Sequence, residues 1–415
     1  MGKVVDLESK PRKRRGRKRP SKTALVLGGG GFTGGVYEIG ALRALDLLAV
    51  NSTVNDFDVY VGTSAGSFVG SMLANGVTPE EMMRVLNERL PSEIDDVDLG
   101  NLLRFNYLGF IGKAAKLPLR SVELLRNLAR MRELSLIDIG VGLAEALPNG
   151  LYSGDGIAEY VERVLGDPGR TDDFRQLERE LYLTATDLDT GERIVFGEEE
   201  WAEIPISTAV QCSTALPLVY KPVELRDRQL VDGGIQSTTN IDVAVEHGAE
   251  LILVVNPLVP FVNDFKKTIP TIFGTRVRRV SDMGLPAIGA QTFRLMSHAR
   301  LRKAVETWEE RYEGVDIVMI EPEPDDELMF GTPIMDYRRR LEIARHGFES
   351  VTRTLAGDYE RFEEIAVKHG LEISGHRLRD VVDRAEEEEP EPASAWRRVF
   401  EQTTSTLLRQ SGEAS

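Results

Sequence analysis

The sequence predicts an α/β protein with a mostly parallel central sheet. Short runs of β-branched and aliphatic residues alternate with stretches of helical periodicity, and the first two runs each end in a glycine-rich turn. Parallel strands need long crossover connections, and the helical stretches supply them. The predicted strands are residues 23–27, 59–61, 181–185, 193–196, 229–231, 251–255 and 317–320.

Helices are expected after each of the first two strands. In the first, apolar residues recur three positions apart on one helical face: Val36, Ile39, Leu42, Leu45 and Leu48. Residues 64–75 are small and apolar, and Gly76 is placed to end that helix. Residues 78–81 (TPEE) then have the pattern of a capping box with proline at the first helical position, which predicts another helix.

Length and composition indicate a chain with a sizeable core. Of 415 residues 41% are hydrophobic, enough for one large domain or two modest ones. The single cysteine, Cys212, excludes an intrachain disulfide and fits a reducing compartment. We see neither the apolar core of a signal peptide nor a run of about 20 apolar residues that could span a bilayer. We therefore expect a soluble, cytoplasmic protein.

The charge is unevenly distributed. Residues 1–22 hold ten Lys and Arg against Asp6 and Glu8, a net charge of +8. Since the whole chain has a formal net charge of −16, the rest carries −24. So acidic a body argues against nucleic acid as a partner, because phosphate contacts need Lys and Arg. The basic segment is expected to be a disordered tail, either simply solvated or in peripheral contact with anionic membrane.

The chain divides into several segments. We predict a disordered basic tail over residues 1–22 and the catalytic core over residues 23–260. Within the core, residues 91–150 are rich in apolar residues and are either a lid beside the site or plain core. Residues 261–383 are expected to be mostly helical with one strand, and residues 384–415 to form an acidic linker followed by an amphipathic helix.

A glycine loop follows the first strand. Residues 28–35 read GGGGFTGG, and a helix begins just after them. Backbone amides uncovered by side chains, at the start of a helix, form an anion site. Dinucleotide-binding loops share this spacing, but there the second strand ends in an acidic residue, whereas here it ends in Gly62-Thr63-Ser64. The loop is therefore predicted to be an oxyanion hole.

The second strand runs into a predicted nucleophile elbow. Gly62-Thr63-Ser64-Ala65-Gly66 is a G-x-S-x-G sequence with a strand before it and a helix after it. The glycines permit a tight turn with Ser64 at its tip, and the helix N-terminus favours developing negative charge. Ser64 is thus the candidate nucleophile.

The residue that would activate Ser64 is less obvious. A Ser-His-Asp triad needs a histidine, and of the five in the chain only His247 is a passable candidate, although its position is typical of a helix cap. Asp232, in Asp232-Gly233-Gly234, ends a predicted strand and could act as a general base. By itself this sequence is equally an ordinary Asp-Gly turn. Together with the glycine loop and the elbow, the catalytic interpretation is favoured.

Taken together, these motifs resemble the patatin-like phospholipase family. That family has a glycine-rich loop, a G-x-S-x-G elbow and a later D-G-[GA], which correspond here to Gly29-Gly30-Gly31 with Gly34, to residues 62–66 and to residues 232–234. Residues 185–192 and 213–223 are also similar to the family. The resemblance implies a three-layer α/β/α fold with a helical C-terminal extension. It also implies a Ser64–Asp232 dyad that cleaves acyl esters of glycerolipids, with the oxyanion held by amides of Gly29, Gly30 and Gly31 and without a metal or cofactor.

One position departs from the family pattern. A basic residue usually precedes the final glycine of the loop, but this chain has Thr33 there. A preference for neutral esters, or slow turnover, would follow. Two other functions stay open: a lipid-binding or scaffolding relative with a weak or inactive site, and an ordinary α/β-hydrolase that uses His247.

Overall fold

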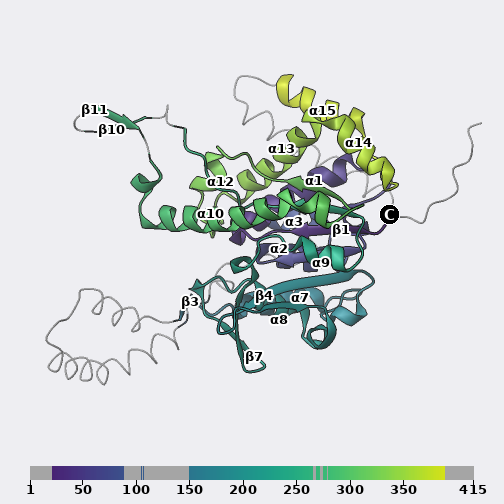
Figure 1. The fold of residues 1–415 in the computed structure, drawn as a ribbon, viewed down its shortest axis with the longest axis vertical. Coiled ribbons are helices and arrows are strands. Elements are labelled where there is room, and N and C mark those ends of the chain that lie inside the picture. The colour runs from purple at the N-terminus through teal and green to yellow at the C-terminus, as the bar shows by residue number, and fades with distance from the viewer. Residues whose placement is uncertain are drawn as a thin grey trace, which may run out of the picture.

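The computed structural model describes residues 21–87, 104, 106, 149–264, 268–271, 274–277 and 279–387. Its centre is an eight-stranded sheet with the order β12-β9-β1-β2-β4-β8-β7, and β5 also pairs with β4 (Figure 1). The five strands from β12 to β4 are parallel, whereas β5, β8 and β7 run antiparallel to their neighbours. The strands are β1 (Thr23–Leu27), β2 (Val59–Thr63), β4 (Glu180–Asp187), β5 (Arg193–Phe196), β7 (Val223–Leu225), β8 (Arg228–Asp232), β9 (Leu251–Val255) and β12 (Asp316–Ile320).

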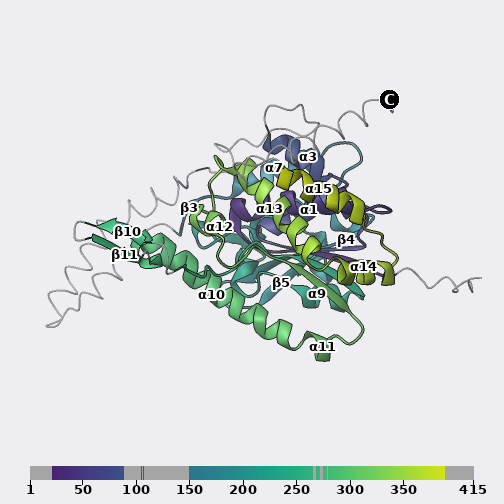
Figure 2. The ribbon, with the colours of Figure 1, turned by 90° about the horizontal axis from the view of Figure 1, so that it is seen from above.

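Helices cover both faces of this sheet. Successive side chains of a strand point to opposite faces, so Leu25 and Leu27 of β1 join one apolar core and Ala24 and Val26 join the other. The first core is closed by α1 (Gly31–Leu48), α2 (Ala65–Ala74), α3 (Pro79–Leu86), α7 (Asp155–Leu165), α8 (Ile206–Ser213), α13 (Arg340–Gly357) and α15 (Gly375–Glu387). The second is closed by α9 (Ile241–Glu246), α10 (Leu285–Glu306) and α11 (Trp308–Arg311). Figure 2 shows the two helical layers on either side of the strands, which confirms the three-layer α/β/α prediction.

The layer around α1 is held by a close helix crossing. An ideal Cβ on Gly40 of α1 would lie 1.8 Å from the carbonyl oxygen of Ala344 in α13. One on Gly347 of α13 would lie 2.1 Å from the carbonyl oxygen of Tyr37. Only glycine permits this approach, so α13 is fixed directly over the helix that follows the glycine loop.

Most predicted elements are present with small shifts in their ends. The strands at 193–196 and 251–255 have the predicted bounds, and α3 begins with the predicted Thr78 capping box. The first helix starts earlier than its apolar periodicity indicated, at Gly31 inside the glycine loop. The C-terminal region is helical as expected, with α12 (Glu327–Gly331), α13, α14 (Tyr359–Lys368) and α15.

Several short strands were not predicted. After residue 260, where one strand was expected, a hairpin of β10 (Thr268–Thr271) and β11 (Gly274–Val277) accompanies β12. The three-residue strands β3 (Gly150–Tyr152), β6 (Leu218–Tyr220) and β7 were also missed. Three residues are too few to show an alternating pattern, so such strands are defined by their partners and not by their own sequence.

Parts of three predicted segments lie outside the described residues. These are residues 1–20 of the tail, residues 91–150 apart from 104, 106, 149 and 150, and the chain after residue 387. Lys22, assigned to the tail, belongs to the folded body: its carbonyl oxygen accepts a hydrogen bond from the Glu250 amide at 2.8 Å. Within the described ranges, no helix has the length and apolar character needed to cross a bilayer.

Candidate active site

Ser64 occupies a strained turn between β2 and α2. Its backbone has φ 55° and ψ −122°, a conformation that costs a non-glycine residue about 1–3 kcal/mol. The flanking glycines are needed for packing. An ideal Cβ on Gly62 would lie 2.5 Å from the carbonyl oxygen of Gly66, and one on Gly66 would lie 2.3 Å from that of Leu27. The predicted elbow is therefore present, with Ser64 at its tip.

Strand register brings Asp232 to the same point. Leu183 of β4 pairs with both β2 and β5, and Ala185 pairs with both β5 and β8, so β2 and β8 lie along the same edge of β4. The pairing with β2 ends at Thr63, opposite Thr184. The next residue of β4, Ala185, pairs with Asp232. Residues 168 positions apart in the chain thus meet where two strands end against a third.

Ser64 and Asp232 are in direct contact. The Ser64 hydroxyl donates a hydrogen bond to Asp232 Oδ2 at 2.6 Å, and the Gly234 amide donates to the other oxygen, Oδ1, at 2.7 Å. Both side chains are buried, with 6% of Ser64 and 2% of Asp232 exposed. Gly233 permits this arrangement, since an ideal Cβ there would lie 2.5 Å from the carbonyl oxygen of Thr184.

The environment of Asp232 shifts its acidity. Burial raises the pKa of its carboxyl group from 3.8 to about 6, against the lowering effect of the hydrogen bonds from Ser64 and Gly234. The carboxylate is therefore mainly ionised at neutral pH, and its proton affinity is higher than that of an exposed aspartate. A base with a pKa just below the working pH suits proton transfer from a hydroxyl group.

Two buried side chains that sequence reasoning missed support this pair. Ser213 Oγ accepts a hydrogen bond from the Ser64 amide at 2.9 Å, holding the strained backbone. Asn240 is fully buried, and its amide group donates to the hydroxyls of Thr63 at 2.8 Å and Thr184 at 3.1 Å. Ser213 lies in the family-like segment 213–223. Asn240 has no recognisable local pattern, because its role depends on strands that are distant in sequence.

The glycine loop lies against Ser64. An ideal Cβ on Gly29 would be 3.3 Å from Ser64 Cβ, and one on Gly34 would be 3.1 Å from Cγ of Pro257. The amide of Gly29 donates to the carbonyl oxygen of Thr238 at 3.2 Å. Among the hydrogen bonds of the described residues, none uses the amides of Gly30 or Gly31. Of the three predicted oxyanion donors, these two are thus available to a ligand.

An apolar cavity of about 140 Å³ opens at Ser64. It runs between α1, α2, α3 and α7, and hydrophobic side chains make up nearly all of its wall. The lining residues with hydroxyl groups are Ser64, Thr214, Tyr160 and Tyr220, and the lining contains no charged residue. The apolar lining is Phe32, Val36, Ile39, Ala65, Phe68, Val69, Met72, Val77, Met82, Val85, Leu86, Ile157, Leu216 and Met335, with Tyr160 and Tyr220.

Thr33 has a structural place in the loop. Its side chain is buried, its hydroxyl donates to the carbonyl oxygen of Pro333 at 2.8 Å, and its amide donates to that of Ile334 at 3.1 Å. These bonds tie the first turn of α1 to the segment before α13. Phe32, and not Thr33, faces the cavity. The position that is usually basic in the family is used here for packing.

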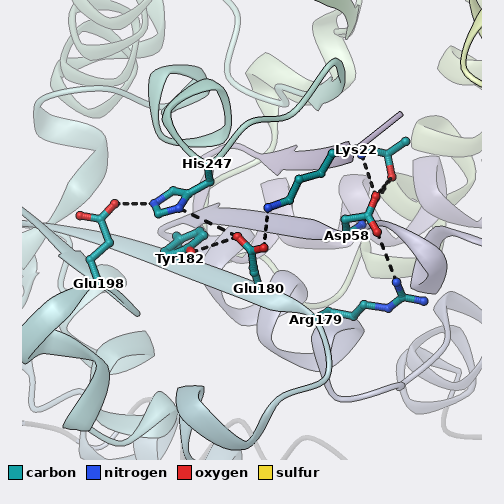
Figure 3. A network of polar contacts seen from close by, with 8 residues as sticks. Lys22, Asp58, Arg179, Glu180, Tyr182, Glu198 and His247 are labelled. Atoms are coloured by element: carbon teal, nitrogen blue, oxygen red, sulfur yellow. Dashed lines mark hydrogen bonds and ion pairs between the residues drawn. The ribbon is translucent and has the colours of Figure 1, made fainter. Parts of the chain in front are cut away.

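His247 lies at the opposite end of the strands from Ser64, beside the start of β4. Figure 3 shows its ring stacked on Tyr182 and placed between Glu180 and Glu198. The ring centroids are 3.8 Å apart, and Nε2 lies 2.7 Å from Glu198 Oε1. Glu180 begins β4, four residues or roughly 13 Å before Thr184, where the strand passes Ser64. His247 is therefore too far from Ser64 to accept its proton, which removes the Ser-His-Asp alternative.

Comparisons with known proteins place the chain in a family. It is 24% identical over 251 residues to the uncharacterized protein R571 of Acanthamoeba polyphaga mimivirus, covering 60% of this chain and 64% of that protein. It is 23% identical over 229 residues to the probable lipid hydrolase 463L of Invertebrate iridescent virus 6, covering 54% of this chain and 63% of that protein. The chain thus spans just under two thirds of the length of these relatives. The crystal structure of VipD from Legionella pneumophila aligns at 16% identity with a TM-score of 0.37, covering 82% of this chain and 67% of VipD. The family model of patatin-like phospholipases matches residues 25–245, more than half of the chain, and the chain therefore belongs to the patatin-like phospholipase family.

Proposed function

We propose that this protein is a serine acyl hydrolase that cleaves lipid esters with Ser64 as nucleophile and Asp232 as general base. The observation that carries the proposal is the 2.6 Å hydrogen bond between these two side chains, at a strained elbow that opens into an apolar cavity. Membership of the patatin-like phospholipase family supports lipid as the substrate class, as does the similarity to a protein named a probable lipid hydrolase.

The proposed reaction has two halves. Asp232 takes the hydroxyl proton of Ser64 as Oγ attacks the ester carbonyl carbon. Negative charge develops on the carbonyl oxygen, where the amides of Gly30 and Gly31 and the N-terminus of α2 stabilise it. The carbon–oxygen bond to the leaving alcohol then breaks, and Asp232 returns its proton to that alcohol. Water, deprotonated by the same carboxylate, attacks the acyl-serine; the bond between Ser64 Oγ and the acyl carbon breaks, the acid is released, and Asp232 returns the proton to Ser64.

The cavity supports an acyl chain as the group held beside Ser64. Its wall is apolar over nearly its whole extent, so a hydrocarbon chain would gain roughly 0.8 kcal/mol for each methylene buried. The lining has no Lys or Arg, and the usual basic position of the loop is the buried Thr33. Since no cation of the lining faces the ester, we propose a preference for esters without a phosphate close to the scissile bond.

The proposal is tested by hydrolysis of a p-nitrophenyl acyl ester series. We expect the wild-type protein to turn over, and Ser64→Ala and Asp232→Asn to lose at least about 10³-fold in kcat while keeping their circular dichroism spectra. Full activity of folded Asp232→Asn would mean that another base serves Ser64. A wild type that binds lipid vesicles but is inert toward every ester would instead favour the non-catalytic lipid-binding function.

A further inference from the structure

Leu218 stands out among the exposed apolar side chains. It is 84% exposed, more than any other large hydrophobic residue in the described ranges. Its backbone has φ 72°, in the left-handed region that leucine rarely adopts. An exposed leucine gains almost nothing from packing, so neither its side chain nor its backbone conformation is explained by the stability of the fold.

The local geometry shows how Leu218 is displayed. The Val219 amide donates to the carbonyl oxygen of Leu216 at 3.1 Å, closing a four-residue turn with Pro217 in the second position and Leu218 in the third. Proline followed by a residue of positive φ is the pattern of a type II turn, whose third position strongly favours glycine or asparagine. The chain keeps leucine at the tip of this turn, where glycine or asparagine would fit with less strain.

The turn is part of the cavity mouth. Leu216 and Tyr220, on either side of Leu218, both line the cavity that opens at Ser64. β6 pairs in parallel with β3, which carries a second exposed apolar side chain, Leu151, at 46% exposure. An exposed apolar tip is thus continuous with the wall of the cavity through its immediate chain neighbours.

We propose that Leu218 inserts into the surface of a lipid aggregate and seats the cavity mouth on it. The inference rests on the proposed function, because a lipid held in a bilayer or droplet must leave that phase to reach Ser64. An apolar side chain at the mouth keeps the path between lipid and cavity dry. A hydrocarbon surface, unlike a protein pocket, also needs no complementary shape and can accept one projecting leucine.

The experiment compares two substitutions at this position with one elsewhere. Leu218→Asn removes the apolar tip but suits the left-handed turn, and Leu218→Met keeps the tip apolar. Val367→Asn is the matched control: Val367 is 61% exposed on α14, and Figures 1 and 2 place α14 far from β3. Binding of the full chain to phosphatidylcholine vesicles is measured by sedimentation in a Ser64→Ala background, so that the vesicles stay intact.

We expect Leu218→Asn to weaken vesicle binding by about tenfold, the order expected for losing one buried leucine side chain. Leu218→Met and Val367→Asn should bind within about twofold of the parent. With Ser64 restored, Leu218→Asn should lose a similar factor in hydrolysis of vesicle lipid while p-nitrophenyl butyrate is cleaved at nearly the parent rate. Thermal unfolding should show Leu218→Asn to be no less stable than the parent.

Other outcomes would overturn the proposal. Equal vesicle binding by the parent and Leu218→Asn would show that Leu218 does not meet lipid. An equal loss on the soluble ester would place Leu218 in the cavity and not at a surface. A dimer that dissociates on Leu218→Asn substitution would make a second copy of the chain the occupant. If no ester is cleaved by any variant but binding still depends on Leu218, the lipid contact stands and the proposed hydrolysis fails.

Discussion

At the scale of single residues, the site depends on a carboxyl group held away from water. Asp232 is 2% exposed, and its two oxygens accept hydrogen bonds from Ser64 and from the Gly234 amide. Burial disfavours the ionised form and the hydrogen bonds favour it, and burial has the larger effect. Asp232 is therefore a stronger base than an exposed aspartate while still being ionised at neutral pH.

This balance predicts the pH dependence of activity. The proposed mechanism needs ionised Asp232, whose pKa is about 6, so kcat/KM should fall tenfold per pH unit as the pH drops below about 6. Above pH 7 it should reach a plateau. The measurement is the rate on a soluble neutral ester from pH 4.5 to 8.5, with folding monitored at each pH. A rate that stays constant down to pH 4.5 would show that Asp232 is not the titrating base.

Residue scale is also where prediction from sequence has its limits. The sequence predicts Ser64 and Asp232 as a pair because each stands at the end of a strand with glycines close by, and the structure brings them together. The sequence does not predict Asn240 or Ser213, although both hold the strand ends that carry the pair. Their contacts cross between elements, so no spacing within the chain reveals them.

At the scale of elements, α2 positions both the proposed nucleophile, Ser64, and one wall of the cavity. Ser64 precedes its first residue, and one face of the helix lines the cavity through Ala65, Phe68, Val69 and Met72. That spacing follows the helical repeat, so the cavity runs along the helix axis for about 10 Å from Ala65 to Met72. An extended chain of three bonds spans about 3.5 Å, so this length corresponds to roughly nine bonds.

Met72 should therefore influence acyl-chain length. Met72→Ala removes side-chain atoms from the wall and should shift the preferred p-nitrophenyl ester by about two carbons or more toward longer chains. Leu73→Ala is the control, because Leu73 is equally buried on α2 but does not line the cavity. Both variants should lose about 2–5 kcal/mol of stability. A shift of chain-length preference in Leu73→Ala as large as in Met72→Ala would contradict the proposed role of the cavity.

Elements with strong periodicity were predicted well, and short ones were not. The parallel strands, α3 and the helical C-terminal region follow from local pattern and capping. The hairpin of β10 and β11 and the three-residue strands exist through their pairing and left too little pattern to be recognised. The start of α1 was misplaced for a related reason: glycines carry no apolar periodicity, although helical geometry continues through them.

At the scale of the whole molecule, the sheet separates two polar sites. The carboxyl end of β2 meets Asp232 beside the apolar cavity. The opposite end of the strands carries a polar network, which Figure 3 shows; its members are Lys22, Asp58, Arg179, Glu180, Glu198 and His247. From sequence His247 is a plausible catalytic residue, because a histidine's neighbours do not reveal at which end of the parallel strands it lies. The direction of the strands in the assembled fold determines that His247 lies at the end away from Ser64.

Topology explains why the motifs were informative. In a parallel sheet, loops after the strands gather at one edge, so the glycine loop after β1 and the elbow after β2 had to be neighbours. The antiparallel entry of β8 along β4 was not predictable, yet it is what delivers Asp232 to that edge. The family resemblance supplied this link where local physics did not.

The most direct test of Ser64 as the nucleophile is reaction of the folded protein with a fluorophosphonate probe, followed by intact-mass and peptide mass spectrometry. We predict a single adduct on Ser64, no adduct in Ser64→Ala, and much slower labelling of Asp232→Asn. Ser67, one helical turn further on and bonded to the Ser64 carbonyl oxygen, should stay unmodified. An adduct on another residue, or none on well-folded wild-type protein, would contradict the assignment of Ser64 and Asp232 as the catalytic pair.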